Sequence, residues 1–429
     1  MKLSSFFSKK ALLFTIVLSF ITCSICAQQL ETIDEGPKKF EYKYKENDSY
    51  RILSTVEEDV FVNGTKHHSA EIVNRISVKV HDVNEEKMTA INEGTFMTTE
   101  NSVMAFQANT KTFSYGEEYK STFTKDRFGV YTIDDNFFMP TVRDVPVFPD
   151  KELSYGDEWT YVGHEAHDLR RSFGLQKPYK VPFTAKYKYF GVFEDKNTED
   201  GSIKKLDLFQ VYYELSYTMD TSKLAISVME TPYKTTGFSS QLIFWDNDRG
   251  TIDHYVESFR IEINTTAGNI FTFVGNAHAE VTEFERTATV ENVEDVTQKI
   301  ADLGLEDVSV KQTEKGLTLS IENIQFKPDS DILLLSEKKK LDKLKDILSA
   351  YPNNDLLVTG HTALRGTAES RQELSEQRAE AVANYLVQIG VRDNYHIFTQ
   401  GKGAEEPIAT NQTEAGRKKN RRVEITIMD

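Results

Sequence analysis

The stretch Leu356-Leu357-Val358-Thr359-Gly360, together with the segment that follows it up to Gly390, decides the fold of the C-terminal part of the chain. The first five residues form a short apolar run, which is typical of a buried strand. From about Ala368 to Ile389 apolar residues recur at helical spacing, and glycine at position 390 is a natural helix terminator. This part of the chain is therefore predicted to begin an α/β unit.

The flanking segments complete this unit. Ser336 is predicted to cap a helix with one apolar face, which Pro352 stops. The apolar face consists of Leu341, Leu344 and Leu348. Strands are expected at residues 317–326, 396–399 and 423–427, and a short leading helix at 293–303. The order βαβαββ predicts a compact α/β sandwich over residues 291–429, with helices packed on one face of the sheet.

Several short motifs follow one another in a fixed order here. They are Gly360-His361-Thr362, Gly366, Leu374-Ser375-Glu376-Gln377-Arg378-Ala379, Val382, Gly401-Lys402-Gly403, Pro407, Asn411, Gly416-Arg417 and Asn420-Arg421-Arg422-Val423-Glu424. Through these motifs residues of about 317–429 resemble the OmpA-type C-terminal peptidoglycan-binding domain of the OmpA/Pal/MotB-like family. The resemblance implies an OmpA-like fold that binds a peptidoglycan stem peptide.

The resemblance also implies how the ligand is held. The family grips the ammonium of a diamino acid with an Asp after the Gly-His-Thr turn, and its carboxylate with a helix Arg, here Arg378. A guanidinium can hold a carboxylate through two parallel hydrogen bonds. The Asp is replaced by Ala363, and an Asn on the helix is replaced by Arg371. Losing one charge-assisted hydrogen bond predicts roughly 10- to 100-fold weaker binding of diaminopimelate.

Three interpretations of this altered pocket stay open. The domain has kept the fold and lost the ligand, it binds a wall with another diamino acid such as ornithine, or it binds diaminopimelate through other contacts. The remaining candidate peptidoglycan-binding residues are Thr362, Leu374, Phe326, Arg421 and Arg422. For Phe326 and Leu374 the alternative is core packing. For Arg421 and Arg422 the alternatives are bracing of the pocket and a solvated basic loop, and His361 is expected to be a hydrogen-bonded structural residue.

Residues 28–290 alternate apolar and polar side chains in short runs, for example Phe209-Gln210-Val211-Tyr212-Tyr213. Turn-prone pairs such as Asn63-Gly64 separate these runs, which predicts antiparallel β-rich structure. Three prolines, Pro140, Pro146 and Pro149, are typical of a connector. We therefore expect two β-rich domains, at residues 28–146 and 147–290, with one continuous sheet as the alternative.

Residues 1–27 differ from the rest of the chain. Lysines at positions 2, 9 and 10 precede an apolar run, which is typical of a secretory signal peptide. Cleavage is expected before Gln28, and the alternatives are lipidation at Cys23 and an uncleaved anchor. The expected location is the periplasm or the periplasmic face of the outer membrane.

Composition excludes several function classes. The chain has 51 Lys and Arg against 67 Asp and Glu, a net charge of −16, which disfavours nucleic acid as a partner. Both cysteines lie within the expected leader, so the body has no Cys-based site. His164 and His167, near Glu165 and Asp168, are expected on a surface loop rather than at a metal. We expect no catalytic residues, no cofactor and no metal.

These observations predict a non-enzymatic envelope protein. It is expected to dock on peptidoglycan through its C-terminal domain and to link the wall to the outer membrane or to an envelope protein partner. The alternative is a periplasmic enzyme, or a ligand or lipid carrier, in residues 28–290, with the C-terminal domain as a degenerate tether. A converging pair of carboxylates or a closed apolar cavity in that region would favour the alternative.

Overall fold

The chain divides into two compact units in the computed structural model. Unit 1 comprises residues 1–107 and 117–283, and unit 2 comprises residues 108–116 and 284–429. The structure describes residues 30–103, 113–114, 117–196, 202–220, 230–283, 287–313, 315–326, 332–352, 354–394 and 396–428. The expected leader, including Cys23, lies outside the described residues.

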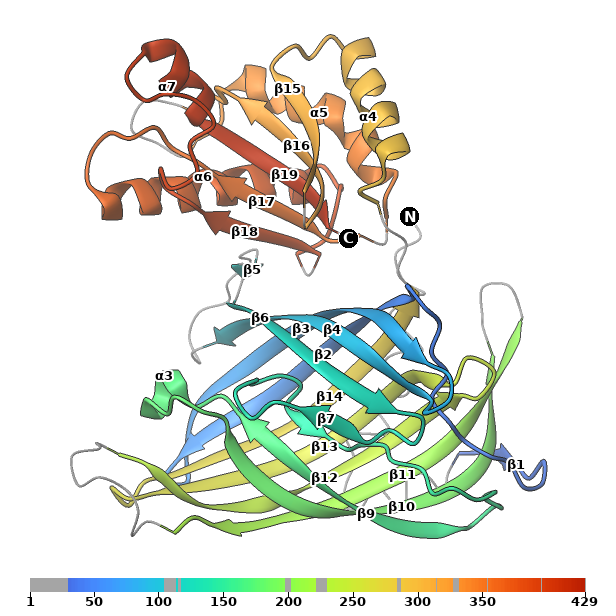
Figure 1. The fold of residues 1–429 in the computed structure, drawn as a ribbon. Coiled ribbons are helices and arrows are strands. Elements are labelled where there is room, and N and C mark those ends of the chain that lie inside the picture. The colour runs from blue at the N-terminus through green and yellow to red at the C-terminus, as the bar shows by residue number, and fades with distance from the viewer. Residues whose placement is uncertain are drawn as a thin grey trace. The chain divides into compact units, whose positions relative to one another are not determined.

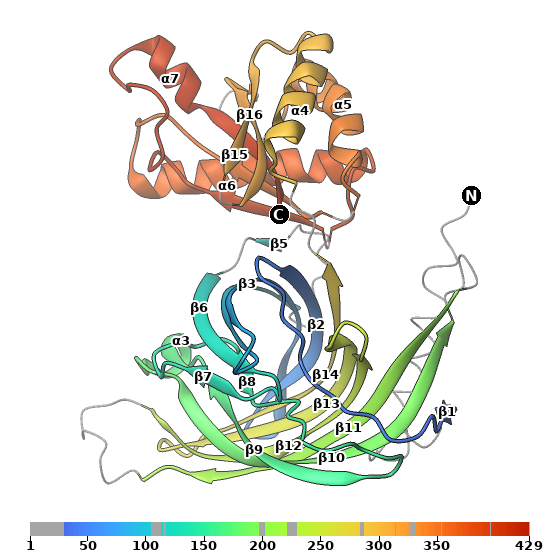
Figure 2. The ribbon, with the colours of Figure 1, turned by 45° about the vertical axis from the view of Figure 1, so that its right-hand side comes forward.

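Unit 1 is built on one large, strongly curved antiparallel sheet (Figures 1 and 2). Its strands are β1 (Thr32–Ile33), β2 (Ser49–Val62), β3 (Thr65–Asn84), β4 (Thr89–Val103), β6 (Glu117–Asp126), β7 (Tyr131–Ile133), β8 (Val142–Arg143), β9 (Glu158–His167), β10 (Tyr179–Lys196), β11 (Ile203–Thr218), β12 (Pro232–Asp246), β13 (Thr251–Thr265) and β14 (Ile270–Glu283). The order is β7-β6-β4-β3-β2-β14-β13-β12-β11-β10-β9-β8, and β1 pairs with β10. A single helical turn, α3 (Arg170–Phe173), follows β9.

The structure corrects the expected boundary near residue 147. Strand β2 pairs with β14 along nearly its whole length, for example at Val56 and Ala277, so strands from both sides of the boundary share one sheet. Several strands are also long, from 14 residues in β2 to 20 in β3, where the sequence suggested short runs. The predicted turn at Asn63 and Gly64 is confirmed, since both residues have positive φ between β2 and β3.

An aromatic core fills the inner face of this sheet. The N-terminal segment places Phe40 4.9 Å from the ring of Phe209, and Tyr42 4.8 Å from Trp245, both in edge-on geometry. Edge-on aromatic pairs add stability beyond the area that they bury. The segment before β2 is therefore part of the core of unit 1.

Unit 2 is an α/β domain with a mixed sheet of order β15-β16-β19-β17-β18-β5. Its elements are β5 (Phe113–Ser114), α4 (Val290–Asp302), β15 (Val308–Thr313), β16 (Gly316–Glu322), α5 (Leu335–Ser349), β17 (Leu356–Gly360), α6 (Ala368–Gln388), β18 (Ile397–Gly401), α7 (Glu414–Asn420) and β19 (Arg422–Met428). Helices α4, α5 and α6 bury their apolar residues in one core with the sheet. Strand β17 pairs in parallel with β18 and antiparallel with β19.

The sequence located most of these elements, with three differences. Helix α5 starts one residue before Ser336, and its N-cap, Leu334, makes no side-chain capping bond. The first predicted strand ends at Glu322, and Phe326 instead forms an isolated bridge with Leu333. Strand β15 and helix α7 were not predicted. Helix α6 ends where predicted, with Gly390 at φ 75°. In the part of the chain that the structure describes, no helix has the length and apolar character needed to cross a membrane.

Lys125 on β6 carries a buried amine in unit 1. Its Nζ lies 3.6 Å from the centroid of the Tyr42 ring and 4.9 Å from that of Tyr131, and the residue is 8% exposed. Burial lowers the pKa of this amine to about 7, against the opposing effect of Asp144. Between about pH 7 and 10 the unfolded chain therefore holds a proton on this lysine that the folded chain does not.

We expect the thermal stability of unit 1 to rise with pH over that window. The reason is that the folded state binds fewer protons, and the gain amounts to a few kcal/mol. Substituting Lys125→Met should raise the melting temperature at pH 7 and flatten this rise. The exposed Lys120→Met on the same strand is the matched control. A Lys125→Met protein that melts no higher than wild type at pH 7 would contradict the lowered pKa of Lys125.

Candidate functional site

The candidate site of unit 2 is organised by a close approach between α6 and the ends of β17 and β18. A Cβ atom on Gly360 would lie 2.0 Å from the carbonyl oxygen of Ser375, and one on Gly401 would lie 2.5 Å from Ser375 Oγ. Both distances are shorter than real Cβ contacts, so glycine is required at these two strand ends. Ser375 is fully buried at this contact.

Hydrogen bonds then fix the turn that follows β17. The backbone N–H of Thr362 donates to the Gly403 carbonyl at 2.7 Å, and the N–H of Gly403 donates to Ser375 Oγ at 2.9 Å. The N–H of Leu364 donates to Asn411 Oδ1 at 3.1 Å. The turn that carries Thr362 and Ala363 is thereby tied to α6, and both of these residues are buried.

Arg378 lies one helical turn after Ser375 on α6. Its guanidinium carbon is 4.9 Å from the centroid of the Phe326 ring, which brings these two predicted site residues together. Its Nε is buried and has no hydrogen-bond partner among the described residues. Burial, and to a lesser extent the nearby Arg421, lower the pKa of Arg378. A guanidinium packed against a ring and lacking an anionic partner among the described residues is a ready receptor for a carboxylate.

Arg371 lies on the same face of α6 as Arg378, two turns earlier. Its Nη1 donates to the Gly366 carbonyl at 2.6 Å, so the side chain contacts the end of the loop between β17 and α6. Its Nε is buried, and no hydrogen-bond acceptor for it lies in the part of the chain that the structure describes. Leu374 lies between the two arginines along the helix and is half-buried.

The basic run after α7 contains side chains with different roles. Arg417 and Arg421 both bind Glu414, at 2.8 and 2.7 Å, so Arg421 is partly neutralised. Arg422 is 2% exposed and donates to Glu424 at 2.8 Å and to the Glu406 carbonyl at 3.0 Å. Of the roles predicted for Arg422, this burial and these two contacts fit bracing of the pocket.

Glu414 was missed by the sequence analysis. Its spacing of three and seven residues from Arg417 and Arg421 was an available signal. The hydrogen bond expected for His361 is also missing. Both ring nitrogens are buried without a hydrogen-bond partner among the described residues, and Nε2 lies 4.0 Å from Glu424 Oε2. Burial, followed by the charge of Arg422, lowers the pKa of His361 to about 4, so the ring is neutral at pH 7.

Unit 1 carries a second candidate site on the face of the sheet that holds the aromatic core. Tyr213 donates to Glu165 at 2.8 Å, and Ser239 donates to Glu257 at 2.6 Å. His167 Nε2 lies 2.9 Å from the other oxygen of Glu165. Burial, reinforced by Glu165, raises the pKa of Glu257 to about 7. Two carboxyl groups therefore approach each other within one polar network.

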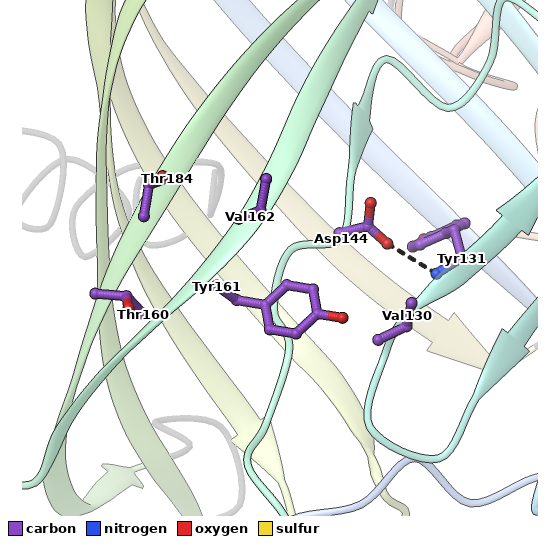
Figure 3. A pocket seen from close by; sticks show the side chains of 7 residues that line it. All are labelled: Val130, Tyr131, Asp144, Thr160, Tyr161, Val162 and Thr184. Atoms are coloured by element: carbon purple, nitrogen blue, oxygen red, sulfur yellow. Dashed lines mark hydrogen bonds between the residues drawn. The ribbon is translucent and has the colours of Figure 1, made fainter.

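The structure corrects the expectation that His164 and His167 lie on a surface loop. Both histidines belong to β9. In the described ranges no group of three or more His, Cys, Asp or Glu side chains is arranged to hold a metal ion. A separate cleft of about 470 Å³ lies where the two ends of the sheet approach, lined by Val130, Tyr131, Asp144, Thr160, Tyr161, Val162 and Thr184 (Figure 3). There Asp144 accepts the Tyr131 N–H at 2.8 Å (Figure 3).

Comparison with known proteins identifies unit 2. Residues 325–421 match the OmpA family. Over 104 residues the chain is 41% identical to the peptidoglycan-binding protein ArfA of Mycobacterium tuberculosis, covering 24% of this chain and 32% of that protein. Over 121 residues it is 37% identical to the probable lipoprotein YiaD of Escherichia coli, covering 28% and 55%. The chain thus spans between about a third and just over half of these relatives.

Among solved structures, the peptidoglycan-associated lipoprotein from Burkholderia pseudomallei is similar to this chain. The sequence identity is 31% and the TM-score is 0.23. The match covers 25% of this chain and 87% of that structure.

The paired carboxyl groups of unit 1 predict a pH dependence opposite to that of Lys125. Between about pH 4.5 and 7 the folded chain holds a proton on Glu257 that the unfolded chain has lost, so raising the pH destabilises unit 1. We expect Glu257→Gln to remove this slope and to raise the melting temperature at pH 8, because the amide oxygen still accepts from Ser239. The exposed Glu152→Gln is the control. If the melting temperature of Glu257→Gln falls between about pH 4.5 and 7 as steeply as that of wild type, Glu257 does not titrate in this pH range.

Proposed function

Because residues 325–421 form a domain of the OmpA family, we propose that this protein docks on peptidoglycan through unit 2 and anchors unit 1 in the cell envelope. The observation that carries the proposal is the guanidinium of Arg378, which packs on Phe326 and has no anionic partner among the described residues. The name of one relative supports the same activity, since ArfA is a peptidoglycan-binding protein, and the name of another, the probable lipoprotein YiaD, supports a place in the cell envelope.

The proposal includes a location and a linking role. We propose the periplasm or the periplasmic face of the outer membrane, reached through the leader at residues 1–27. Unit 1 would then link the wall to the outer membrane or to an envelope protein. The composition of the chain supports a role outside nucleic-acid binding, since the net charge is −16.

The proposal predicts a specific loss of binding. Arg378→Ala should lose a bidentate carboxylate contact that contributes about 2–3 kcal/mol, roughly a 30- to 150-fold rise in Kd. The measurement is co-sedimentation of the full-length protein with purified peptidoglycan sacculi over a concentration series.

Lys339→Ala is the matched control, because it removes one exposed positive charge from α5 of the same domain. It should bind sacculi as wild type does. A loss seen only in Arg378→Ala then comes from the site and not from the lower positive charge of the domain. If Arg378→Ala and wild type sediment equally well, the carboxylate contact is not at Arg378. If wild type itself does not sediment with sacculi, the docking proposal fails.

A second candidate function rests on the network of unit 1. Glu165 and Glu257 approach each other on the core face of the sheet and share it with Tyr213 and Ser239, the arrangement that favours a ligand carrier or an enzyme. Native mass spectrometry of the protein, purified from the periplasmic fraction of its own cells, tests whether unit 1 carries a ligand. A bound small molecule that is present in wild type and absent from Glu257→Gln would support it, and a ligand-free wild type would count against it.

A further inference from the structure

Strand β9 of unit 1 has a free edge. On the side away from β10 its neighbour is β8, which pairs with it only at His164 and Glu165, near the end of the strand. From Glu158 to Val162, β9 pairs with β10 alone among the described strands. This stretch is therefore an edge strand, although both flanking ends of the sheet approach here.

The unpaired backbone groups of this edge follow from the alternation of an antiparallel ladder, in which successive residues direct their N–H and C=O groups to opposite neighbours. The N–H of Ala166 points away from β10 and donates to the Thr141 carbonyl at 2.7 Å. The register of β9 with β10 has no shift along the strand. Thr160 and Val162 therefore also direct their backbone groups away from β10, and these groups have no backbone partner in the described part of the chain.

The chain that follows β8 leaves this edge open. Asp144 accepts the N–H of Tyr131 at 2.8 Å, and the N–H of Phe148 donates to the Phe128 carbonyl at 2.9 Å. The segment 144–148 is thus bonded to the connection between β6 and β7. Within the described residues it makes no backbone hydrogen bond to the free stretch of β9.

The cleft of about 470 Å³ lies beside this edge. Strand β9 contributes Thr160, Tyr161 and Val162 to its lining, and Val130 lies across from the Tyr161 ring (Figure 3). Val162 is 65% exposed and Tyr161 is 37% exposed. The edge thus presents apolar side chains together with unpaired backbone groups, and such an edge is a template for pairing with another strand.

Asp144 gives the cleft a negative group. Its Oδ1 accepts the Tyr131 N–H, whereas its Oδ2 lies 3.8 Å from His164 Nδ1, which is too far for a hydrogen bond. Burial raises the pKa of Asp144, and Lys125 and Arg143 oppose this effect without forming an ion pair with it in the described chain. The described lining contains no Lys or Arg, so a basic group of a ligand has a partner here.

From this arrangement we infer that the free edge of β9 is a docking site for an extended peptide segment of a partner protein. The segment pairs its backbone with Thr160 and Val162, packs apolar side chains against Tyr161, and brings a basic side chain to Asp144. In such strand addition the main chain provides affinity and alternate side chains provide specificity.

Charge favours a different protein over a second copy of this chain. A second copy that paired through the same edge would bring another Asp144 and, from the cleft lining, no basic group. The inference rests on the linking role proposed for unit 1 and gives that role a surface. It does not depend on the docking of unit 2 on peptidoglycan.

Selection of phage-displayed random octapeptides on the full-length protein tests the inference. Wild type should select peptides that are rich in β-branched residues and carry Lys or Arg. Val162→Pro should select none above background, because proline removes the free N–H, which is not part of the β9–β10 ladder. Val162→Thr keeps this N–H and is the matched control, so it should select the same peptides as wild type.

Isothermal titration of the tightest peptide then tests strand pairing directly. Two versions are methylated on the backbone nitrogens of odd or of even positions. Only one set of N–H groups can face β9, so one version should bind wild type roughly tenfold or more weakly and the other should bind as the parent does. Replacing the basic residue by norleucine should weaken binding to wild type but not to Asp144→Asn, whose amide oxygen still accepts from Tyr131.

The outcomes are decisive even if Val162→Pro fails to fold, because the methylated peptides are compared on wild type. If wild type selects no peptide, or if both methylated versions bind as tightly as the parent, the inference is wrong. If sedimentation velocity shows a wild-type dimer that Val162→Pro abolishes, the edge pairs with a second copy and the proposed partner is wrong. Val162→Pro should still sediment with sacculi, so peptide binding and wall docking can fail separately.

Discussion

The geometry of the unit 2 site depends on the contact between Ser375 and two strand ends. Because Gly360 and Gly401 have no side chains, the backbone and hydroxyl of Ser375 rest directly on β17 and β18. The hydroxyl then accepts from Gly403, and the carbonyl of Gly403 accepts from Thr362. The turn after β17, the loop after β18 and α6 are thus fixed to one another by a few short contacts. These contacts also fix the position of Arg378, because it lies one helical turn after Ser375 on α6.

The fold of unit 2 was predictable because its signals are local. The apolar run of β17 and the helical spacing of α6 lie within single segments, and Gly390 adopts the left-handed conformation that its position implied. The start of α5 was less predictable, since a serine at position 336 suggested a cap that the structure does not use. The role of Arg422 was left open between wall contact, bracing of the pocket and a solvated loop for another reason. Its partner Glu424 lies two residues along the same strand, and only the fold shows that this side of β19 is buried.

The topology of unit 1 was not predictable in the same way. Alternation of apolar and polar residues indicates that a segment is a strand, but does not identify the strand with which it pairs. The pairing of β2 with β14 joins residues about two hundred positions apart, as at Val56 and Ala277. The proline-rich segment suggested a domain boundary, whereas in the structure it connects the two ends of a single sheet. Proline avoids strand interiors both at a boundary between domains and in a connection within one sheet, so this residue type alone does not distinguish the two arrangements.

The two units differ in the protonation of their buried ionisable groups. In unit 2 a cation stays charged next to apolar groups, because Arg378 has too high a pKa to lose its proton near neutrality. In unit 1 burial brings both an amine, Lys125, and a carboxyl group, Glu257, to pKa values of about 7. Below pH 7 the amine becomes a buried cation, and above pH 7 the carboxyl becomes a buried anion. Lys125 therefore opposes folding most strongly below pH 7, with a cost that fades toward pH 10, and Glu257 opposes it most strongly above pH 7, with a cost that grows from about pH 4.5. An apolar residue at either position would avoid this cost. Ionisable groups with strongly shifted pKa values cluster at functional sites as well as in structural networks, so the inner face of unit 1 is where the proposed second function is to be tested.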